Sequence, residues 1–268
     1  MTQNQLYIIV EMRRKDTRHT MQKLKSSHHM FIQAFMTRGV MNGTEVFNLL
    51  KLSCEKYGDY DEASRTQLLL DYCHTINSNI SMLGLEIKKG KDETNGTGYY
   101  GLVNTVESNI TLLASQYTEN ELQFFKMLLE EFVKSESGTI GSIEALGISE
   151  KIPKKMSKTD ANQLLDRFER EKWIGKSKEG RMYLGIRGVM EMEQYIFEMF
   201  EDFAVRCNMC KKLCIQGARC MNGECETRMH FHCAQRVFRG KSEKRCPECR
   251  GPWQESSQTR QADQVEME

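Results

Sequence analysis

The feature that most constrains this chain is a cluster of cysteines near its C-terminal end. Of the ten cysteines in 268 residues, eight lie between positions 207 and 249. Seven of these, with one histidine, form four closely spaced pairs: Cys207/Cys210, Cys220/Cys225, His230/Cys233 and Cys246/Cys249. A segment of about forty residues buries too little apolar surface to fold alone. The cluster therefore predicts a small domain that metal ions stabilise.

The residue types in the cluster point to zinc. Thiolates and imidazole are the ligands that Zn²⁺ prefers, and eight of them fill two tetrahedral sites completely. A closed set of four ligands leaves no position for water, so we expect structural rather than catalytic ions. Each should contribute on the order of 10 kcal/mol or more to folding. RING and PHD modules cross-brace such pairs, which would place Cys207, Cys210, His230 and Cys233 at one site, and Cys220, Cys225, Cys246 and Cys249 at the other.

Two further residues leave alternatives for the ligand set. Cys214 could replace Cys220, and His232 could replace His230. Cys214 follows Cys210 too closely for a long first loop, so we interpret it as a buried or free thiol. His230 lies three positions before Cys233, whereas His232 is adjacent to it, and the spacing favours His230.

The order of four cysteines, one histidine and three cysteines occurs in PHD fingers, but other positions favour a RING. The place of the usual PHD tryptophan, two residues before Cys246, holds Lys244. Met209 and Pro247 lie inside the first and last pairs, where RINGs contact a ubiquitin-conjugating enzyme. Arg250 occupies the position of the arginine that holds donor ubiquitin. Alternatively, Met209 and Pro247 only pack the knuckles and Arg250 is a solvated charge.

Composition sets the context of this domain. The net charge is only +1 and 28% of residues are charged, so any affinity for nucleic acid must come from a local patch. No apolar run has the length of a membrane span, and the short run 6–10 is followed at once by Glu11. We therefore expect an intracellular protein, in which disulfides are uncommon. The two remaining cysteines, Cys54 and Cys73, lie at apolar helical positions and are interpreted as core thiols.

The rest of the chain shows one pattern of elements twice. Apolar spacing predicts helices over about 20–38, about 44–57 and from about 61, followed by a hairpin with strands at 85–88 and 99–103. The pattern recurs with a capping box at Thr118–Glu121, a short element at 142–146, and a helix capped at Ser157. A second hairpin (173–176 and 181–184) and a last helix with Val189, Phe200 and Phe203 on one face follow. Three helices closed by a hairpin indicate a winged helix; an unrelated bundle with two decorations is the alternative.

The predicted architecture is therefore α+β, mainly helical, with two tandem winged-helix domains followed by a C-terminal two-zinc cross-braced RING-like domain. The expected boundaries are an unassigned extension (1–18), winged-helix domain A (19–112), winged-helix domain B (113–204), the variant RING (205–253) and a disordered tail (254–268). Because no Gly/Pro/Ser linker precedes Cys207, we expect the zinc module to be held rigidly against domain B.

Together with the cysteine string, four short segments carry a resemblance to a known family: 87–90, 190–196, 215–217 and 228–230. The chain closely resembles the first non-SMC element subunits of the Smc five/six complex over roughly 20–253. The resemblance implies two winged-helix domains followed by a variant RING, and assembly with a MAGE-type subunit and the kleisin. It also implies a nuclear, chromosome-associated role in DNA repair by homologous recombination, and ligase activity that needs the MAGE partner. The second cysteine pair has four intervening residues where the family commonly has two.

Two classes of function follow. The first is a RING-type E3 ubiquitin transferase subunit without a covalent catalytic residue, and its rival is a structural adaptor whose zinc module and winged helices only dock partners and DNA. A DNA surface is a separate possibility, since residues 151–190 contain eleven Lys/Arg and five Asp/Glu, leaving a net charge of +6. Its candidate contacts are Lys176, Lys178 and Arg181, although a solvated face or protein docking explains the same charge.

Overall fold

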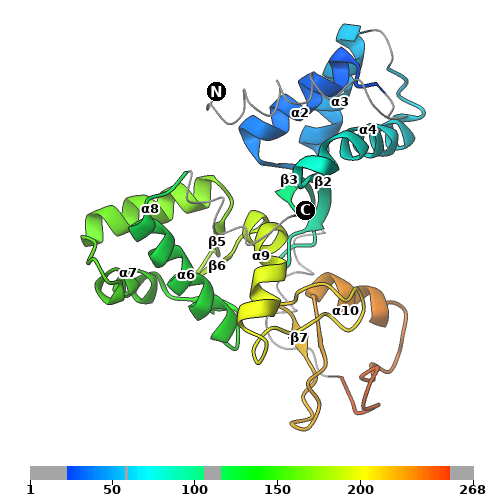
Figure 1. Cartoon of the computed structure of the whole chain (residues 1–268). Helices are drawn as coiled ribbons and strands as arrows, with labels where there is room; N and C mark the ends of the chain where they lie inside the picture. Colours follow the sequence, from blue (N-terminus) through cyan, green and yellow to red (C-terminus); the bar gives the residue numbers. More distant parts are fainter. Residues whose placement is uncertain (1–22, 58–59, 106–115, 254–268) are drawn as a thin grey trace. The chain divides into compact units, whose positions relative to one another are not determined.

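The computed structural model describes residues 23–57, 60–105 and 116–253, which divide into two compact units (Figure 1). The first unit extends to Gly90 and resumes at Gly98, whereas the segment Lys91–Thr97 belongs to the second unit. The predicted N-terminal extension and C-terminal tail lie outside the described residues. Within the described ranges, each helix is too short or too polar to cross a membrane.

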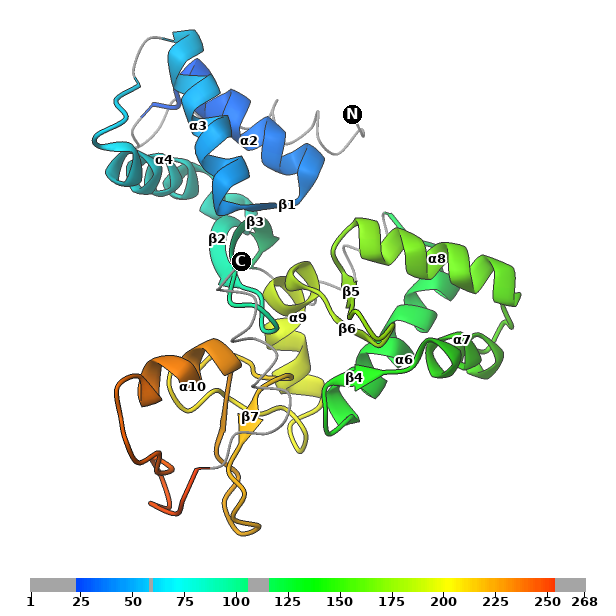
Figure 2. The ribbon, with the colours of Figure 1, turned by 180° about the vertical axis from the view of Figure 1, so that it is seen from behind.

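The first unit combines helices with one antiparallel sheet of strand order β1-β3-β2 (Figure 2). Val40 in β1 lies opposite Gly101 in β3. In chain order its elements are α2 (Ser26–Arg38), β1 (Val40–Asn42), α3 (Gly43–Tyr57), α4 (Arg65–Ile80), the 3-10 turn η1 (Ser81–Leu83), β2 (Leu85–Lys91) and β3 (Gly98–Asn104).

The ends of α2 follow from local hydrogen bonds. The helix begins at Ser26, later than predicted, because the imidazole of His28 turns back and its Nδ1 accepts the backbone N–H of Lys25 at 3.1 Å. It ends at Arg38, as predicted, and the next residue, Gly39, has a φ of 71° and donates its N–H to the carbonyl of Phe35. Between these ends, Phe31 and Phe35 are fully buried against Leu50. The apolar positions of the sequence thus form the core of this unit.

The second unit repeats the same order of elements before residues 205–253, which are predicted to bind zinc and are called the zinc module below. Its elements are α6 (Glu119–Lys134), β4 (Thr139–Ile140), α7 (Ser142–Lys151), α8 (Lys158–Arg170), β5 (Ile174–Lys176), β6 (Met182–Leu184), α9 (Ile186–Met199), β7 (Ala218–Arg219), β8 (Arg228–Met229) and α10 (Phe231–Phe238). The antiparallel sheet order β4-β6-β5 matches the β1-β3-β2 order of the first unit. The sequence predicted the hairpin strands of both sheets but neither β1 nor β4, and the winged-helix interpretation stays a prediction.

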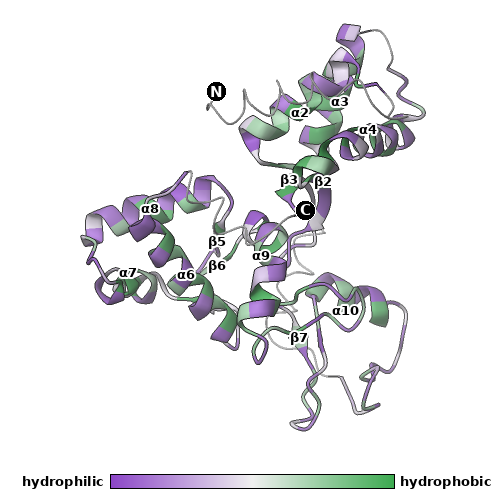
Figure 3. Ribbon diagram, viewed as in Figure 1, coloured by the Kyte–Doolittle hydropathy of each residue, from purple (hydrophilic) through white to green (hydrophobic). Residues whose placement is uncertain are grey.

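An aromatic core holds the helical part of the second unit together. Trp173 is fully buried, its ring 5.5 Å from that of Phe125, and the guanidinium of Arg187 lies 4.2 Å above it. Along α6 and α8, hydrophobic and hydrophilic residues occupy different faces (Figure 3). The capping box at Thr118 is confirmed, since its hydroxyl accepts the N–H of Glu121 and the Glu121 carboxylate accepts the N–H of Thr118.

Two predictions about helix lengths in this unit are wrong. The short element expected at 142–146 is a full helix, α7, reaching Lys151. The last helix ends at Met199, because Phe200 leaves the helical conformation with a φ of −129°. Phe203 therefore lies beyond the helix and is 46% exposed instead of facing inward.

The zinc module packs directly on the helical part of the second unit. Leu213 and Ile215 are buried in the same hydrophobic cluster as α6 and α9. The backbone N–H of Leu213 donates to Glu193 at 3.0 Å, and the guanidinium of Arg219 donates to the carbonyl of Glu136 at 2.6 Å. The guanidinium of Arg206 lies 3.7 Å from the ring of Phe197. These contacts agree with the expectation that the module is held against the preceding domain.

Candidate metal centres

Two knuckles of nearly identical backbone carry the first and last cysteine pairs. The N–H of Cys207 donates to the carbonyl of Lys212 at 2.8 Å, and Lys211 N–H returns to the Cys207 carbonyl at 2.9 Å. In the second knuckle the N–H of Cys246 donates to Gly251, and Arg250 N–H returns to Cys246. Lys211 and Arg250 both have a φ of 62°, in the left-handed region that residues other than glycine rarely adopt. Each turn aims its two sulfurs toward one point.

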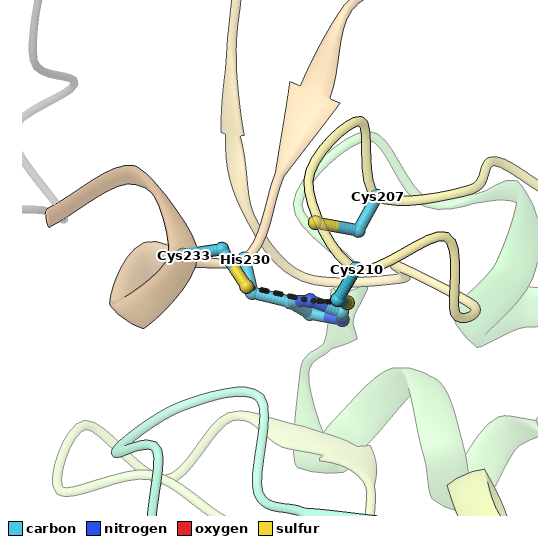
Figure 4. A group of neighbouring side chains, drawn as sticks. All are labelled: Cys207, Cys210, His230 and Cys233. Atoms are coloured by element: carbon cyan, nitrogen blue, oxygen red, sulfur yellow. Dashed lines mark hydrogen bonds between the residues drawn. The ribbon is translucent and has the colours of Figure 1, made fainter. Parts of the chain in front are cut away.

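The first candidate centre joins one knuckle to the start of α10. Cys207, Cys210, His230 and Cys233 offer one ligand atom each, and these four atoms lie within 4.8 Å of one another. Figure 4 shows Cys210 pointing at the ring of His230, whose Nδ1 lies 3.4 Å from the sulfur. The Sγ of Cys233 is 3.8 Å from the same Nδ1. The imidazole therefore presents Nδ1 to the group.

The second candidate centre joins the other knuckle to the loop between β7 and β8. Cys220, Cys225, Cys246 and Cys249 form it, again within 4.8 Å. The Sγ atoms of Cys220 and Cys249 are 3.6 Å apart, and those of Cys225 and Cys246 are 3.8 Å apart. The hydroxyl of Thr227 lies 3.2 Å from the Cys225 sulfur. The structure thus brings the eight predicted residues together in the two predicted groups.

The spacing of the donor atoms fits tetrahedral zinc. Zn–S bonds of about 2.3 Å and Zn–N bonds of about 2.0–2.1 Å place two sulfurs roughly 3.8 Å apart, and a sulfur and a nitrogen roughly 3.6 Å apart. The observed S···S separations of 3.6 and 3.8 Å, and S···N separations of 3.4 and 3.8 Å, lie close to these values. Disulfide bonds need about 2.05 Å, so these sulfurs are not paired covalently.

Hydrogen bonds within the first group favour thiolate. A hydrogen bond from the Cys233 thiol, and another from His230, lower the pKa of Cys207 to about 2 against the opposing effect of burial. A thiolate rather than a thiol is the form that binds a metal. The same hydrogen bond raises the pKa of Cys233, so the proton of the pair stays on Cys233 and Cys207 is the thiolate.

The two alternative ligands lie outside the two four-residue groups. Cys214 is fully buried, donates to the carbonyl of Gln216 at 3.4 Å, and has its pKa raised by burial to about 12. With Glu93 and His230 it forms a third group whose ligand atoms lie within 4.8 Å of one another, on the side of the His230 ring that faces Glu93. His232 stacks on His230 with centroids 5.1 Å apart, and its buried Nδ1 has no hydrogen-bond partner among the described residues.

The three candidate contacts for a conjugating enzyme and ubiquitin are accessible on the knuckles. Met209, between the first two ligands, is 36% exposed. Pro247 is half-buried, and Arg250 is exposed directly after the last ligand. A hollow of about 730 Å³ opens between the knuckles and the loop 222–228.

The candidate DNA contacts differ from one another. Lys176 and Lys178 are exposed at the β5–β6 hairpin. Arg181 instead donates to the hydroxyl and the carbonyl of Thr139, at 2.6 and 2.8 Å. Its guanidinium therefore ties β4 to the hairpin, which leaves the two lysines as the better candidates.

The sequence did not predict one buried residue that contacts the first group. Glu93, assigned only to a polar hairpin tip, is 5% exposed and lies 3.1 Å from Nε2 of His230. Nothing in its local sequence separates it from the neighbouring Asp92. A contact across 137 positions leaves no periodic or spacing signal.

Comparison with known proteins agrees with this geometry. A family described as the Nse1 non-SMC component of the SMC5-6 complex matches residues 28–192, and a RING-like domain matches residues 207–249. The chain is 37% identical to the non-structural maintenance of chromosomes element 1 homolog of Xenopus laevis over 232 residues, covering 86% of this chain and 84% of that protein. The human homolog is 37% identical over 227 residues, covering 84% and 83%.

A more distant relative and a solved structure extend the match. The Schizosaccharomyces pombe protein is 22% identical over 232 residues, covering 86% of this chain and 93% of that protein. A chain of a solved structure named as the Nse1-Nse3-Nse4 complex is 35% identical, with a TM-score of 0.78. The match covers 88% of this chain and all of that one. Since the family match spans more than half of the chain and a relative 37% identical covers 86% of it, the protein belongs to the Nse1 family of SMC5-6 complex components.

Proposed function

We propose that this protein is a RING-type E3 ubiquitin transferase subunit of its Smc five/six complex. The observation that carries the proposal is the placement of Met209, Pro247 and Arg250 on two knuckles whose donor atoms are spaced for zinc. Met209 and Arg250 are exposed there, and Pro247 is half-buried. Membership of the Nse1 family and the RING-like match support the same reading.

The proposed mechanism forms no covalent bond to this chain. Two structural Zn²⁺ ions, held by the two four-residue groups, would fix the knuckles by closing their ligand sets. Met209 and Pro247 would contact the conjugating enzyme, and Arg250 would bind the ubiquitin joined to it. Restricting the thioester to a reactive pose lowers the entropic part of the barrier to its attack by a lysine.

The proposed assembly and place of action come from the family. The matched solved chain belongs to a structure named for Nse1, Nse3 and Nse4. We propose that this chain likewise binds a MAGE-type non-SMC element subunit and the kleisin, and that the MAGE partner is needed for activity. The complex would act in the nucleus on chromosomes, in double-strand break repair by homologous recombination.

Matched variants test the ligase assignment. With the MAGE-type partner present, autoubiquitination should fall about tenfold or more for Met209→Ala, corresponding to at least ~1.4 kcal/mol of lost interaction. Met221→Ala is the control, since Met221 is 62% exposed on the same module but lies outside both knuckles' ligand pairs. Arg250→Ala should also lose activity, whereas Lys211→Ala, which has the same φ in the other knuckle, should not. Full activity in both Met209→Ala and Arg250→Ala would remove these residues from the mechanism.

A structural adaptor is the second candidate function. The observation that favours it is the burial of Leu213 and Ile215 in the core of the helical part, which makes the zinc module part of a larger platform. Such an adaptor could also present Lys176 and Lys178 to DNA phosphates. The adaptor function predicts that neither Met209→Ala nor Arg250→Ala changes ubiquitin transfer, and that the complex still binds its partners and DNA. Charge reversal at both lysines that leaves DNA affinity of the complex unchanged would remove the DNA interface.

A further inference from the structure

The imidazole of His230 is held from the side opposite the sulfurs. Its Nδ1 faces Cys210 and Cys233, whereas its Nε2 lies 2.8 Å from the carbonyl oxygen of Leu213 and 3.1 Å from Oε1 of Glu93. A neutral histidine that binds a metal through Nδ1 carries its proton on Nε2. Both oxygens therefore accept from the same N–H, and they define the plane and tautomer of the ring.

The carboxylate of Glu93 accepts hydrogen bonds from three N–H groups, one of which is Nε2–H of His230. Its Oε1 also accepts the backbone N–H of Ile215 at 3.1 Å, and its Oε2 accepts that of Gln216 at 2.9 Å. The side chain is 5% exposed, and a buried carboxylate without such donors would be costly. Hydrogen bonds to an ionised acceptor are stronger than those between neutral groups. The carboxylate thus connects the 213–216 loop to the ring of His230.

The segment Lys91–Thr97, which belongs to the second unit, fixes the backbone at Glu93. The side chain of Asp92 accepts the N–H of Thr94 at 2.8 Å, and the N–H of Asp92 donates to the carbonyl of Thr97 at 2.9 Å. Gly96, with a φ of 70°, donates to the Asp92 carbonyl, and a Cβ there would lie 3.0 Å from that of His232. The turn therefore has little freedom to move the carboxylate.

We propose that Glu93 is a positioning residue of the first zinc site, orienting His230 so that Nδ1 faces the ion. The inference rests on the proposed zinc binding by Cys207, Cys210, His230 and Cys233. Acceptors that hold the remote N–H of a metal-bound histidine raise its basicity, and losing one typically costs about 10–100-fold in metal affinity. The second site contains only cysteines, so its affinity should not depend on Glu93.

Zinc release from the full chain tests this role. Zinc is first counted per chain, and its transfer to a chromophoric chelator is then followed for wild type and Glu93→Gln. The glutamine keeps the size of the side chain, but its amide nitrogen cannot accept a hydrogen bond. One of the two ions should transfer about 10–100-fold more readily, and the other should behave as in wild type.

Glu193→Gln is the matched control. Glu193 accepts the backbone N–H of Leu213 at 3.0 Å, so its carboxylate holds the same loop through a residue that is not a predicted zinc ligand. Both ions of this variant should transfer as in wild type. Cadmium-113 NMR of the cadmium-substituted chain adds a readout that loss of fold alone would not give. The resonance of the three-sulfur, one-nitrogen site should shift in Glu93→Gln, while that of the four-sulfur site stays in place.

The outcomes separate this inference from the proposed zinc binding. If wild type binds two ions and both transfer equally faster from Glu93→Gln, Glu93 contributes only to folding in general, and the positioning role is overturned. The positioning role is also overturned if both ions transfer from Glu93→Gln at the same rates as from wild type. A wild-type chain that binds no zinc would overturn the zinc sites themselves.

Discussion

Ile215 provides a direct test of whether the zinc module and the helical part of the second unit fold together. Its side chain is 5% exposed and packs in the core cluster that contains Phe125 and Trp173. Ile215→Ala removes three carbon groups, worth about 0.8 kcal/mol each on transfer, or roughly 2.4 kcal/mol. The residual cavity raises the expected loss to about 2–5 kcal/mol. For a folding unit of this size the melting temperature should fall by about 2–4 °C for each kcal/mol.

The assay is thermal and urea unfolding of the full, zinc-loaded chain. Ile143→Ala is the control, because Ile143 is 87% exposed and its truncation should change stability by less than about 0.5 kcal/mol. Adding EDTA to remove zinc should release the 213–215 loop, so that the effect of Ile215→Ala on the helical part shrinks. An unchanged melting temperature in zinc-loaded Ile215→Ala would refute the packed arrangement and indicate a tethered module.

Three further predictions concern single sites. Burial lowers the pKa of His28 to about 4, so the unfolded chain binds a proton at this histidine before the folded chain does as pH falls below about 6.5. Between about pH 6.5 and pH 4 this site should therefore lower the free energy of unfolding by up to ~1.4 kcal/mol per pH unit. His28→Gln should lack this part of the pH dependence. Mass spectrometry under native conditions should find one zinc in Cys220→Ser but two in Cys214→Ser; the reverse result would exchange their roles. Gly96→Ala should lower the melting temperature more than Gly180→Ala, since both glycines have a positive φ but only Gly96 lies against His232. Equal decreases would show that backbone strain alone causes the loss.

Spacing along the chain was enough to predict the four ligand pairs, because the two members of each pair have only two to four residues between them. The cross-brace known for RING and PHD modules then assigned the pairs to the two groups that the structure shows. Helical periodicity likewise identified the buried faces of α6 and α8. The strands β1 and β4, with three and two residues, are too short to show alternation and were missed.

Contacts distant in sequence were beyond the reach of these patterns. In the sequence Ile215 lies between predicted zinc ligands, which indicates a loop, yet its side chain belongs to the core of the preceding helices. Glu93 reads as a solvated turn residue, yet it is buried behind His230. The end of α9 was misplaced because Phe200 and Phe203 continue the apolar spacing after the backbone has left the helix. Tertiary packing decided each of these positions.

X-ray absorption at the zinc edge of the full chain tests the two-centre assignment most directly. The account predicts two zinc ions per chain with, on average, seven sulfur ligands to one nitrogen, from the seven cysteines and His230. Zn–S distances should be about 2.3 Å and the Zn–N distance about 2.0–2.1 Å. A second nitrogen per pair of ions, an oxygen ligand, or a single bound ion would contradict the assignment.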